Sequence, residues 1–166
     1  MTARFTRRDD GTLDLTLDQA EADLIRTLPD QLLAVYQGDR DDPARQRLFP
    51  RAYLDPTEEE AENQWEDLVH PDLLTDRVAA LDTLRDAIDQ AEPGRRGLVV
   101  VHIDADQADR WLSVLNDARL ALGTRIGVTE DTDLSQLDSR DPDAAPKAAY
   151  AWLTYLQGEL VETLLG

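Results

Sequence analysis

Apolar residues at helical spacing are the feature that most limits how this chain can fold. Along most of the sequence, Leu, Ala, Val and Ile recur every three or four residues, which places them on one face of an amphipathic helix. The stretches with this pattern are residues 17–35, 61–69, 74–88, 112–126 and 150–164. Helices of this kind are stable when their apolar faces bury one another. We therefore predict a helical bundle around one core.

Two segments depart from the helical pattern and predict a small sheet. Residues 4–7 and 12–16 alternate in polarity around an Asp-Gly turn, which is typical of a β-hairpin. Residues 98–103 are a short run rich in Val and Ile, which favours a strand. The predicted fold class is therefore mainly α, a single-domain helical bundle with a small antiparallel sheet made of the hairpin and one strand near 97–103.

Capping residues and prolines predict where the helices begin and end. Asp18 followed by Glu21 forms a capping-box pattern, and Pro43 suits the first turn of a short helix through residue 48. We expect Thr57 to cap a helix that Pro71 interrupts, and Asp104 to cap the central helix. The predicted order within one domain, 1–166, is hairpin 1–17, helices 18–92, strand 97–103, central helix 104–127, acidic loop 128–143 and C-terminal helix 143–165.

Strong acidity limits the partners of this chain. It carries 35 Asp and Glu residues against 17 Lys and Arg, a formal net charge of −18. Such a surface repels phosphate backbones and anionic membranes, whereas nucleic-acid binding relies on basic patches. The richest basic stretch, Arg45, Arg47 and Arg51, is flanked by Asp residues. We expect a protein partner, no nucleic acid and no membrane. With no apolar stretch after the charged N-terminal residues, we expect a cytoplasmic location.

The sequence offers no recognisable catalytic centre. The absence of cysteine excludes disulfides, thiolate metal sites and cysteine catalysis. His70 and His102 are the only histidines, too few for a zinc site of the usual kind. The acidic runs at 104–106 and 130–133 lack the EF-hand spacing, and no Gly-rich phosphate loop follows a strand. We expect no catalytic residue, no metal ion and no cofactor.

One side of the predicted central helix has an unusual composition. Asn116, Arg119, Gly123 and Gly127 fall on this side, with Arg125 close by in the sequence. One interpretation is a buried structural helix, in which Arg and Asn have internal partners. The other is a groove that binds a partner or a ligand. These five residues form our candidate interaction or ligand face.

Three segments of the chain carry a family resemblance. Residues 115–131, 47–53 and 149–157 together resemble an actinobacterial family of unknown function, the domain numbered twenty-seventeen. The resemblance implies a small cytoplasmic protein whose gene often lies beside that of the ClpS proteolytic adaptor. Some members carry a transcription-regulator label, and the resemblance transfers no catalytic residues.

Two classes of function follow from these observations. The leading hypothesis is a non-enzymatic protein-interaction or regulatory module, accessory to ClpS and Clp proteolysis. The alternative is a small-ligand binder or enzyme that uses the Asn116 and Arg119 face, and a transcriptional regulator ranks third. We also predict a homodimer, with Trp152 and Tyr155 on the last apolar stripe as its anchors.

Overall fold

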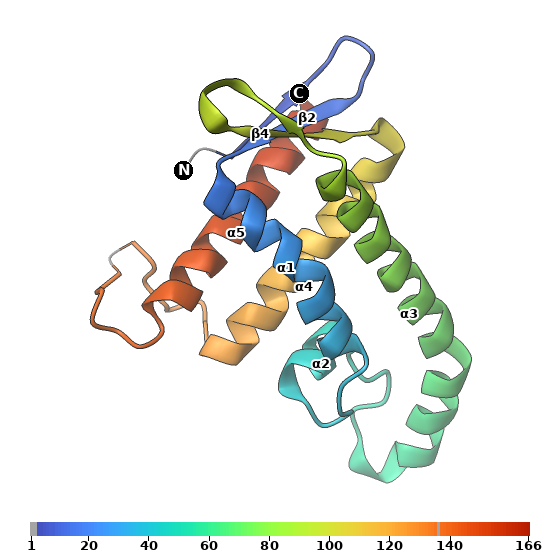
Figure 1. Cartoon of the computed structure of the whole chain (residues 1–166). Coiled ribbons are helices and arrows are strands. Elements are labelled where there is room, and N and C mark those ends of the chain that lie inside the picture. The colour runs from blue at the N-terminus through green and yellow to red at the C-terminus, as the bar shows by residue number, and fades with distance from the viewer. Residues whose placement is uncertain (1–2, 136) are drawn as a thin grey trace.

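Helices dominate the structure, and a small sheet covers one end of them (Figure 1). A computed structural model describes residues 3–135 and 137–166, and over this range the chain forms five α-helices and a four-stranded antiparallel sheet. The predicted fold class is thus confirmed. The strands are β1 (Arg4–Arg7), β2 (Leu13–Leu17), β3 (Glu92–Pro93) and β4 (Val99–Ile103). The α-helices are α1 (Gln19–Tyr36), α2 (Pro43–Leu48), α3 (Glu59–Asp89), α4 (Ala108–Ile126) and α5 (Ala144–Leu165). Short 3-10 turns are η1 (Pro56–Glu58), η2 (Arg95–Gly97) and η3 (Ala105–Gln107).

The sheet follows the order β1-β2-β4-β3, so the hairpin pairs with the Val-rich strand. Leu15 lies opposite Phe5 on one side and Val101 on the other, and all three side chains are buried. On the other face, Asp14 lies opposite His102. Alternation along each strand therefore gives the sheet one apolar face for the helices and one polar face for solvent. The two-residue strand β3 was not predicted.

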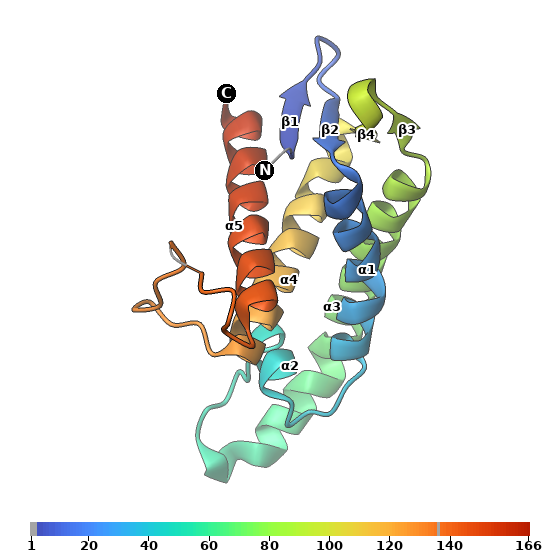
Figure 2. The same ribbon diagram turned by 60° about the vertical axis from the view of Figure 1, so that its left-hand side comes forward.

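Helix α4 occupies the centre of the helical layer (Figure 2). It packs against α5, α3 and α2, and α5 also packs against β1. The side chains of Trp111 and Leu115 on α4 are fully buried in a core that the sheet, α1, α3 and α5 share. Because Leu, Ile and Val from every layer enter this core, the amphipathic stripes of the sequence converge on α4.

Glu21 joins three parts of the chain at the start of α1. Its side chain accepts a hydrogen bond from the Asp18 backbone N–H at 2.9 Å, while the Asp18 side chain accepts one from the Glu21 N–H at 2.8 Å. This is the predicted capping box. The same carboxylate also accepts bonds from the Ala3 backbone N–H at 3.1 Å and the Trp152 indole at 3.2 Å. A helix-capping residue thus also fixes α5 against the N-terminal strand.

Two predicted helix boundaries are wrong, and one predicted capping bond is missing. Helix α3 runs through Pro71 without interruption, and α1 likewise contains Pro29. Proline has no N–H to donate to the carbonyl four residues earlier. In α3 that carbonyl belongs to Asp67, which is exposed, so water can donate to it instead. Thr57 lies in η1, where Asp55 caps it, and Asp104 makes no side-chain capping bond.

Candidate functional site

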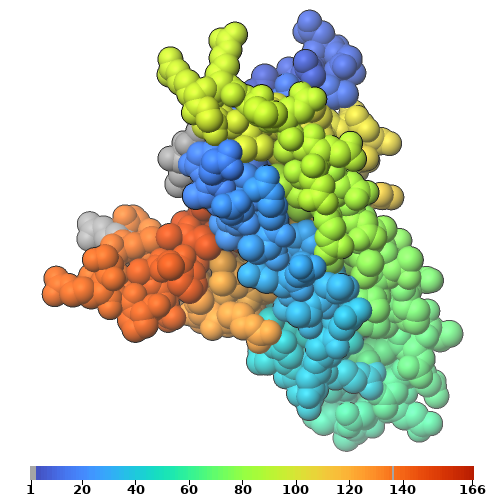
Figure 3. Space-filling model, in the orientation of Figure 1, coloured from blue at the N-terminus to red at the C-terminus, as the bar shows by residue number. Residues whose placement is uncertain are grey.

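An apolar groove runs between α1 and α5 over the C-terminal half of α4. We call it the α1–α4–α5 groove and define it by Leu24 and Val35 of α1, Ala121 and Leu122 of α4, and Ala145 and Ala149 of α5. Its volume is about 560 Å³. Figure 3 shows this face, with the pale orange end of α4 between the blue of α1 and the orange-red start of α5.

The groove is open because its two walls pack on other elements. Helix α1 packs on α3 and α4, while α5 packs on α4 and β1, so α4 forms a floor between them. Two of the four α4 residues that line the groove, Ala118 and Ala121, have small side chains. Small residues let another backbone approach closely, and preferred distances between packed helix axes are roughly 8–10 Å. The arrangement therefore suits an additional helix.

The two glycines of the predicted face, Gly123 and Gly127, each have a structural role in α4. A Cβ on Gly123 would lie 2.8 Å from Cε2 of Tyr150, so only glycine allows α5 to approach α4 here. Gly127 has a φ of 70° and ends α4 in the left-handed conformation. Both glycines of the predicted face thus have structural roles, which agrees with the first of our two interpretations for these positions.

Arg119 and Asn116 lie on the opposite side of the α4–α5 contact from the groove. The Arg119 guanidinium donates to Oδ1 of Asn116 at 3.2 Å, and the Gln157 amide donates to the same oxygen at 3.4 Å. Both α4 residues are half-buried. Arg119 also lines a second pocket of about 360 Å³ together with Arg47, Gly123 and Tyr150. These two residues are therefore neither wholly packed inside nor free on the surface.

Arg125 links the end of α4 to the start of α2 through an ion pair with Asp42. Its guanidinium donates two hydrogen bonds to the Asp42 carboxylate, at 2.6 and 2.8 Å. The same carboxylate accepts from the Ala44 backbone N–H and so caps α2. The bond from Arg125 is the main cause that lowers the pKa of Asp42 below its ordinary value. The structure thus places Arg125 at the end of the groove, away from Arg119.

The predicted dimer anchors lie against the N-terminal segment of the same chain. Trp152 is only 7% exposed, and its indole donates to Glu21. The Tyr155 hydroxyl donates to the Ala3 carbonyl at 3.2 Å. The part of α5 that remains exposed is its other side, including Val161 at 38% exposure. Dimerisation itself stays a prediction.

A buried polar cluster at the junction of α1, α3 and α4 was not predicted. Asp117 is 4% exposed and accepts hydrogen bonds from the Tyr36 hydroxyl at 2.6 Å and from Arg77 at 2.7 Å. Arg77 also donates to the Leu48 carbonyl at 3.2 Å. Burial raises the pKa of Asp117 above its ordinary value, against the opposing effect of these two donors, and burial also raises the pKa of Tyr36. The available signal was an acidic residue at helical spacing between two buried apolar residues of α4, Val114 and Ala121.

Phe49 extends this cluster toward α3. Its ring meets Tyr36 edge-on with centroids 5.6 Å apart and lies 4.8 Å from the His70 ring. The guanidinium of Arg77 sits 5.0 Å above the Phe49 centroid. Arg45 contacts Nε2 of His70 at 3.1 Å, and burial, followed by the charge of Arg45, lowers the pKa of His70. These contacts tie α2 and its following turn to the long helix.

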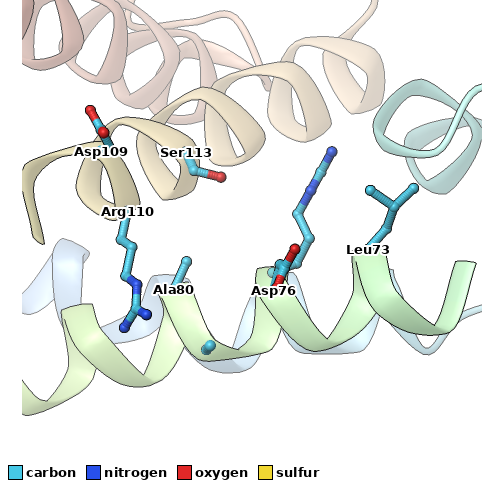
Figure 4. A pocket seen from close by; sticks show the side chains of 8 residues that line it. Leu73, Asp76, Ala80, Asp109, Arg110 and Ser113 are labelled. Carbon is cyan, nitrogen blue, oxygen red and sulfur yellow. The ribbon is translucent and has the colours of Figure 1, made fainter. Parts of the chain in front are cut away.

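Two further polar sites do not converge on a reacting centre. A hollow of about 270 Å³ lies between α3 and α4, and Figure 4 shows Asp109 and Arg110 pointing away from each other there. Arg110 donates instead to the Thr83 hydroxyl at 2.8 Å. On the sheet, His102 bridges Asp14 at 2.7 Å and Glu92 at 3.2 Å. The bond to Asp14, then that to Glu92, raises the pKa of His102.

The described residues contain neither a candidate metal cluster nor a candidate membrane-spanning helix. The part of the chain that the structure describes holds no group of three or more His, Asp or Glu side chains arranged to bind a metal ion. Within residues 3–135 and 137–166, every helix is too short or too polar to span a bilayer.

Comparison with known proteins identifies the family. Proteins named oxidative stress regulator AosR, from Mycobacterium tuberculosis and Mycobacterium bovis, are 29% identical to this chain over 136 residues. The match covers 75% of this chain and 59% of the relatives, so the chain spans less than two thirds of their length. No solved structure gives a significant match. A family model matches residues 1–164, and the chain therefore belongs to the family described as Domain of unknown function (DUF2017).

Proposed function

We propose that this chain is a non-enzymatic regulatory module that binds one amphipathic helix of a partner protein in the α1–α4–α5 groove. The open groove is the observation that carries the proposal. Helices that dock in this way insert apolar side chains spaced three and four residues apart. A volume of about 560 Å³ lies in the range of roughly 300–1,000 Å³ that is usual for pockets holding ligand groups.

Charge indicates the chemistry of the partner. The chain has a net charge of −18, so its field attracts a basic segment and repels an acidic one. Arg125, the cation at the groove, is already neutralised by Asp42. We therefore expect an apolar helix face with Lys or Arg on its flanks.

The relatives support a regulatory role. AosR is named as a regulator of oxidative stress, and a likeness of 29% over part of its length favours the same class of action here. The 166 residues contain no cysteine, so a thiol within them does not sense oxidants. We place the regulatory action in binding instead. The family resemblance adds the ClpS adaptor as the first partner to examine.

A matched pair of α5 variants tests the groove. Ala145 lines the groove and Ala148 does not, although both side chains are exposed on the same helix. Ala145→Arg adds bulk and positive charge to the groove, whereas Ala148→Arg adds the same charge outside it. Affinity purification from native lysate should recover a stoichiometric partner with the wild type and Ala148→Arg, and about tenfold less with Ala145→Arg.

The same variants distinguish the occupants. Purified ClpS that binds wild type and Ala148→Arg but not Ala145→Arg would identify it as the partner. Light scattering that gives a dimer for those two proteins and a monomer for Ala145→Arg would assign the groove to a second copy of the chain. Equal recovery of every partner by both variants would contradict the proposal.

A further inference from the structure

Two arginines face one pocket on the side of the α4–α5 contact opposite the groove. We call it the arginine pocket and define it by Arg47 of α2, Arg119, Gly123 and Thr124 of α4, Glu130 of the following loop, and Tyr150 of α5. Its volume is about 360 Å³. Elements far apart in the sequence thus bring two guanidinium groups to the same cavity.

Within the part of the chain that the structure describes, half of the other arginines pair with a carboxylate, whereas the two arginines of this pocket do not. Arg40, Arg77, Arg85 and Arg125 each contact a carboxylate. In the described residues, no Asp or Glu oxygen lies within 4.0 Å of a guanidinium nitrogen of Arg47 or Arg119. The pocket therefore brings together two guanidinium groups that have no acidic partner within the described residues.

Arg119 also has an unsatisfied donor. Its Nε is buried and has no hydrogen-bond partner among the described residues, and its one hydrogen bond within them runs from a terminal nitrogen to Oδ1 of Asn116. A buried donor without an acceptor is costly, and such groups in native proteins call for a specific explanation. Because solvent does not reach this nitrogen in the structure, a ligand acceptor satisfies it only when the Arg119 side chain shifts on binding.

We propose that the arginine pocket binds the oxyanion group of a small molecule, a phosphate or a carboxylate. Guanidinium groups bind both through paired, charge-assisted hydrogen bonds. Arg119 supplies the half-buried donor from the floor, and the exposed Arg47 approaches from α2. The hydroxyl of Thr124 already donates to the Leu120 carbonyl at 2.9 Å, so the arginines are the main donors to the anion.

Acidic residues restrict which anions can enter. Glu130 forms part of the pocket wall, and Asp131 and Asp133 follow it on the exposed loop. These carboxylates repel nucleic acids and polyphosphates, which carry negative charge beyond the reach of the two arginines. A compact ligand with a single anionic group fits this arrangement best. The site is independent of the groove, so one proposal can fail without the other.

Nuclear magnetic resonance on the whole chain tests the pocket. Inorganic phosphate and acetate are the two probes, each titrated against sodium chloride at equal ionic strength. We expect saturable shifts of the Arg119 Nε–H resonance, with a Kd of about 1 mM or tighter for at least one probe. The probe that binds more tightly identifies phosphate or carboxylate as the preferred group.

Three variants complete the test. Arg47→Gln and Arg119→Gln should each raise the Kd about tenfold, because each removes a charge-assisted contact. Arg51→Gln removes an exposed arginine outside this pocket and should change the Kd less than about twofold. Because Arg47 is exposed and its side chain forms no hydrogen bond or ion pair within the described residues, its variant stays informative even if Arg119→Gln unfolds. No saturable shift with either probe, or equal weakening by Arg51→Gln and Arg47→Gln, would overturn the proposal.

Discussion

Removing Arg77 should show how much the buried polar cluster depends on its single cation. Asp117 is 4% exposed and keeps two donors, Arg77 at 2.7 Å and the Tyr36 hydroxyl at 2.6 Å. In Arg77→Met, the carboxylate stays in the core with only the tyrosine as a donor. Its burial is then no longer offset by an opposite charge.

The size of the effect follows from the burial of the pair. Breaking a buried ion pair by removing one partner costs about 3–5 kcal/mol. The Arg77 side chain is 25% exposed, so water already screens part of the interaction and we take the low end, about 3 kcal/mol. For a chain of this length, that loss corresponds to a fall in Tm of roughly 6–12 °C.

The loss should also depend on pH. Burial raises the pKa of Asp117 in the wild type, and removal of the guanidinium raises it further. Between the unfolded pKa of about 3.9 and the raised folded pKa, the folded state binds more protons, so its stability falls as the pH rises. Arg77→Met should therefore lose less free energy of unfolding at about pH 5 than at about pH 8.

Urea denaturation followed by tryptophan fluorescence measures both effects. Arg85→Met is the matched control, because Arg85 pairs with Asp30 on the surface and should contribute less than about 1 kcal/mol. A loss in Arg77→Met no larger than that in the control would refute our account of the cluster. An equal loss at both pH values would refute the role given to Asp117.

The remaining predictions concern the sheet and the contact between α4 and α5. The pKa of His102 is raised, so this residue adds stability that is fully present below about pH 6.5 and lost as the pH rises through its folded pKa. His102→Asn should lower the free energy of unfolding at about pH 5.5 but not at about pH 9 in urea denaturation, and equal losses would rule this out. Gly123→Ala should lower stability by about 1 kcal/mol, because overpacking against Tyr150 outweighs the better helix propensity of alanine. Calorimetry should find the change neutral or stabilising in a Tyr150→Leu background, and the same loss in both backgrounds would show that the close approach is not its cause.

Local signals in the sequence predicted most of the fold. The Asp-Gly turn predicted the hairpin, Pro43 the start of α2, and the Val-rich run the strand β4. Each signal acts within a few residues, so no knowledge of tertiary contacts was needed. Pro71 was misleading for the same reason, because a proline is tolerated in a helix where the freed carbonyl meets water.

The candidate site was predicted less completely, because it depends on which helices meet. The sequence placed Arg119 and Arg125 on one helix, but Arg125 binds Asp42, which lies 83 residues away. Asp117 lies at helical spacing between the apolar residues Val114 and Ala121, and its partner Tyr36 lies 81 residues away. The groove could not be predicted from the sequence, because its Leu and Ala residues on α1 and α5 have the same helical spacing as buried core residues. It exists because these two helices pack on other elements.

The Glu21 carboxylate binds two groups that the ribosome synthesises at very different times. One carboxylate oxygen accepts bonds from the Ala3 backbone and from Trp152, which follows Glu21 by 131 residues. At a synthesis rate of roughly 5–20 residues per second, about 7–26 seconds pass between the synthesis of Glu21 and that of Trp152. During that interval α5 cannot pack against β1, so the side of the hairpin that α5 covers is accessible to chaperones. The contact between Glu21 and Trp152 therefore forms only after α5 has been synthesised.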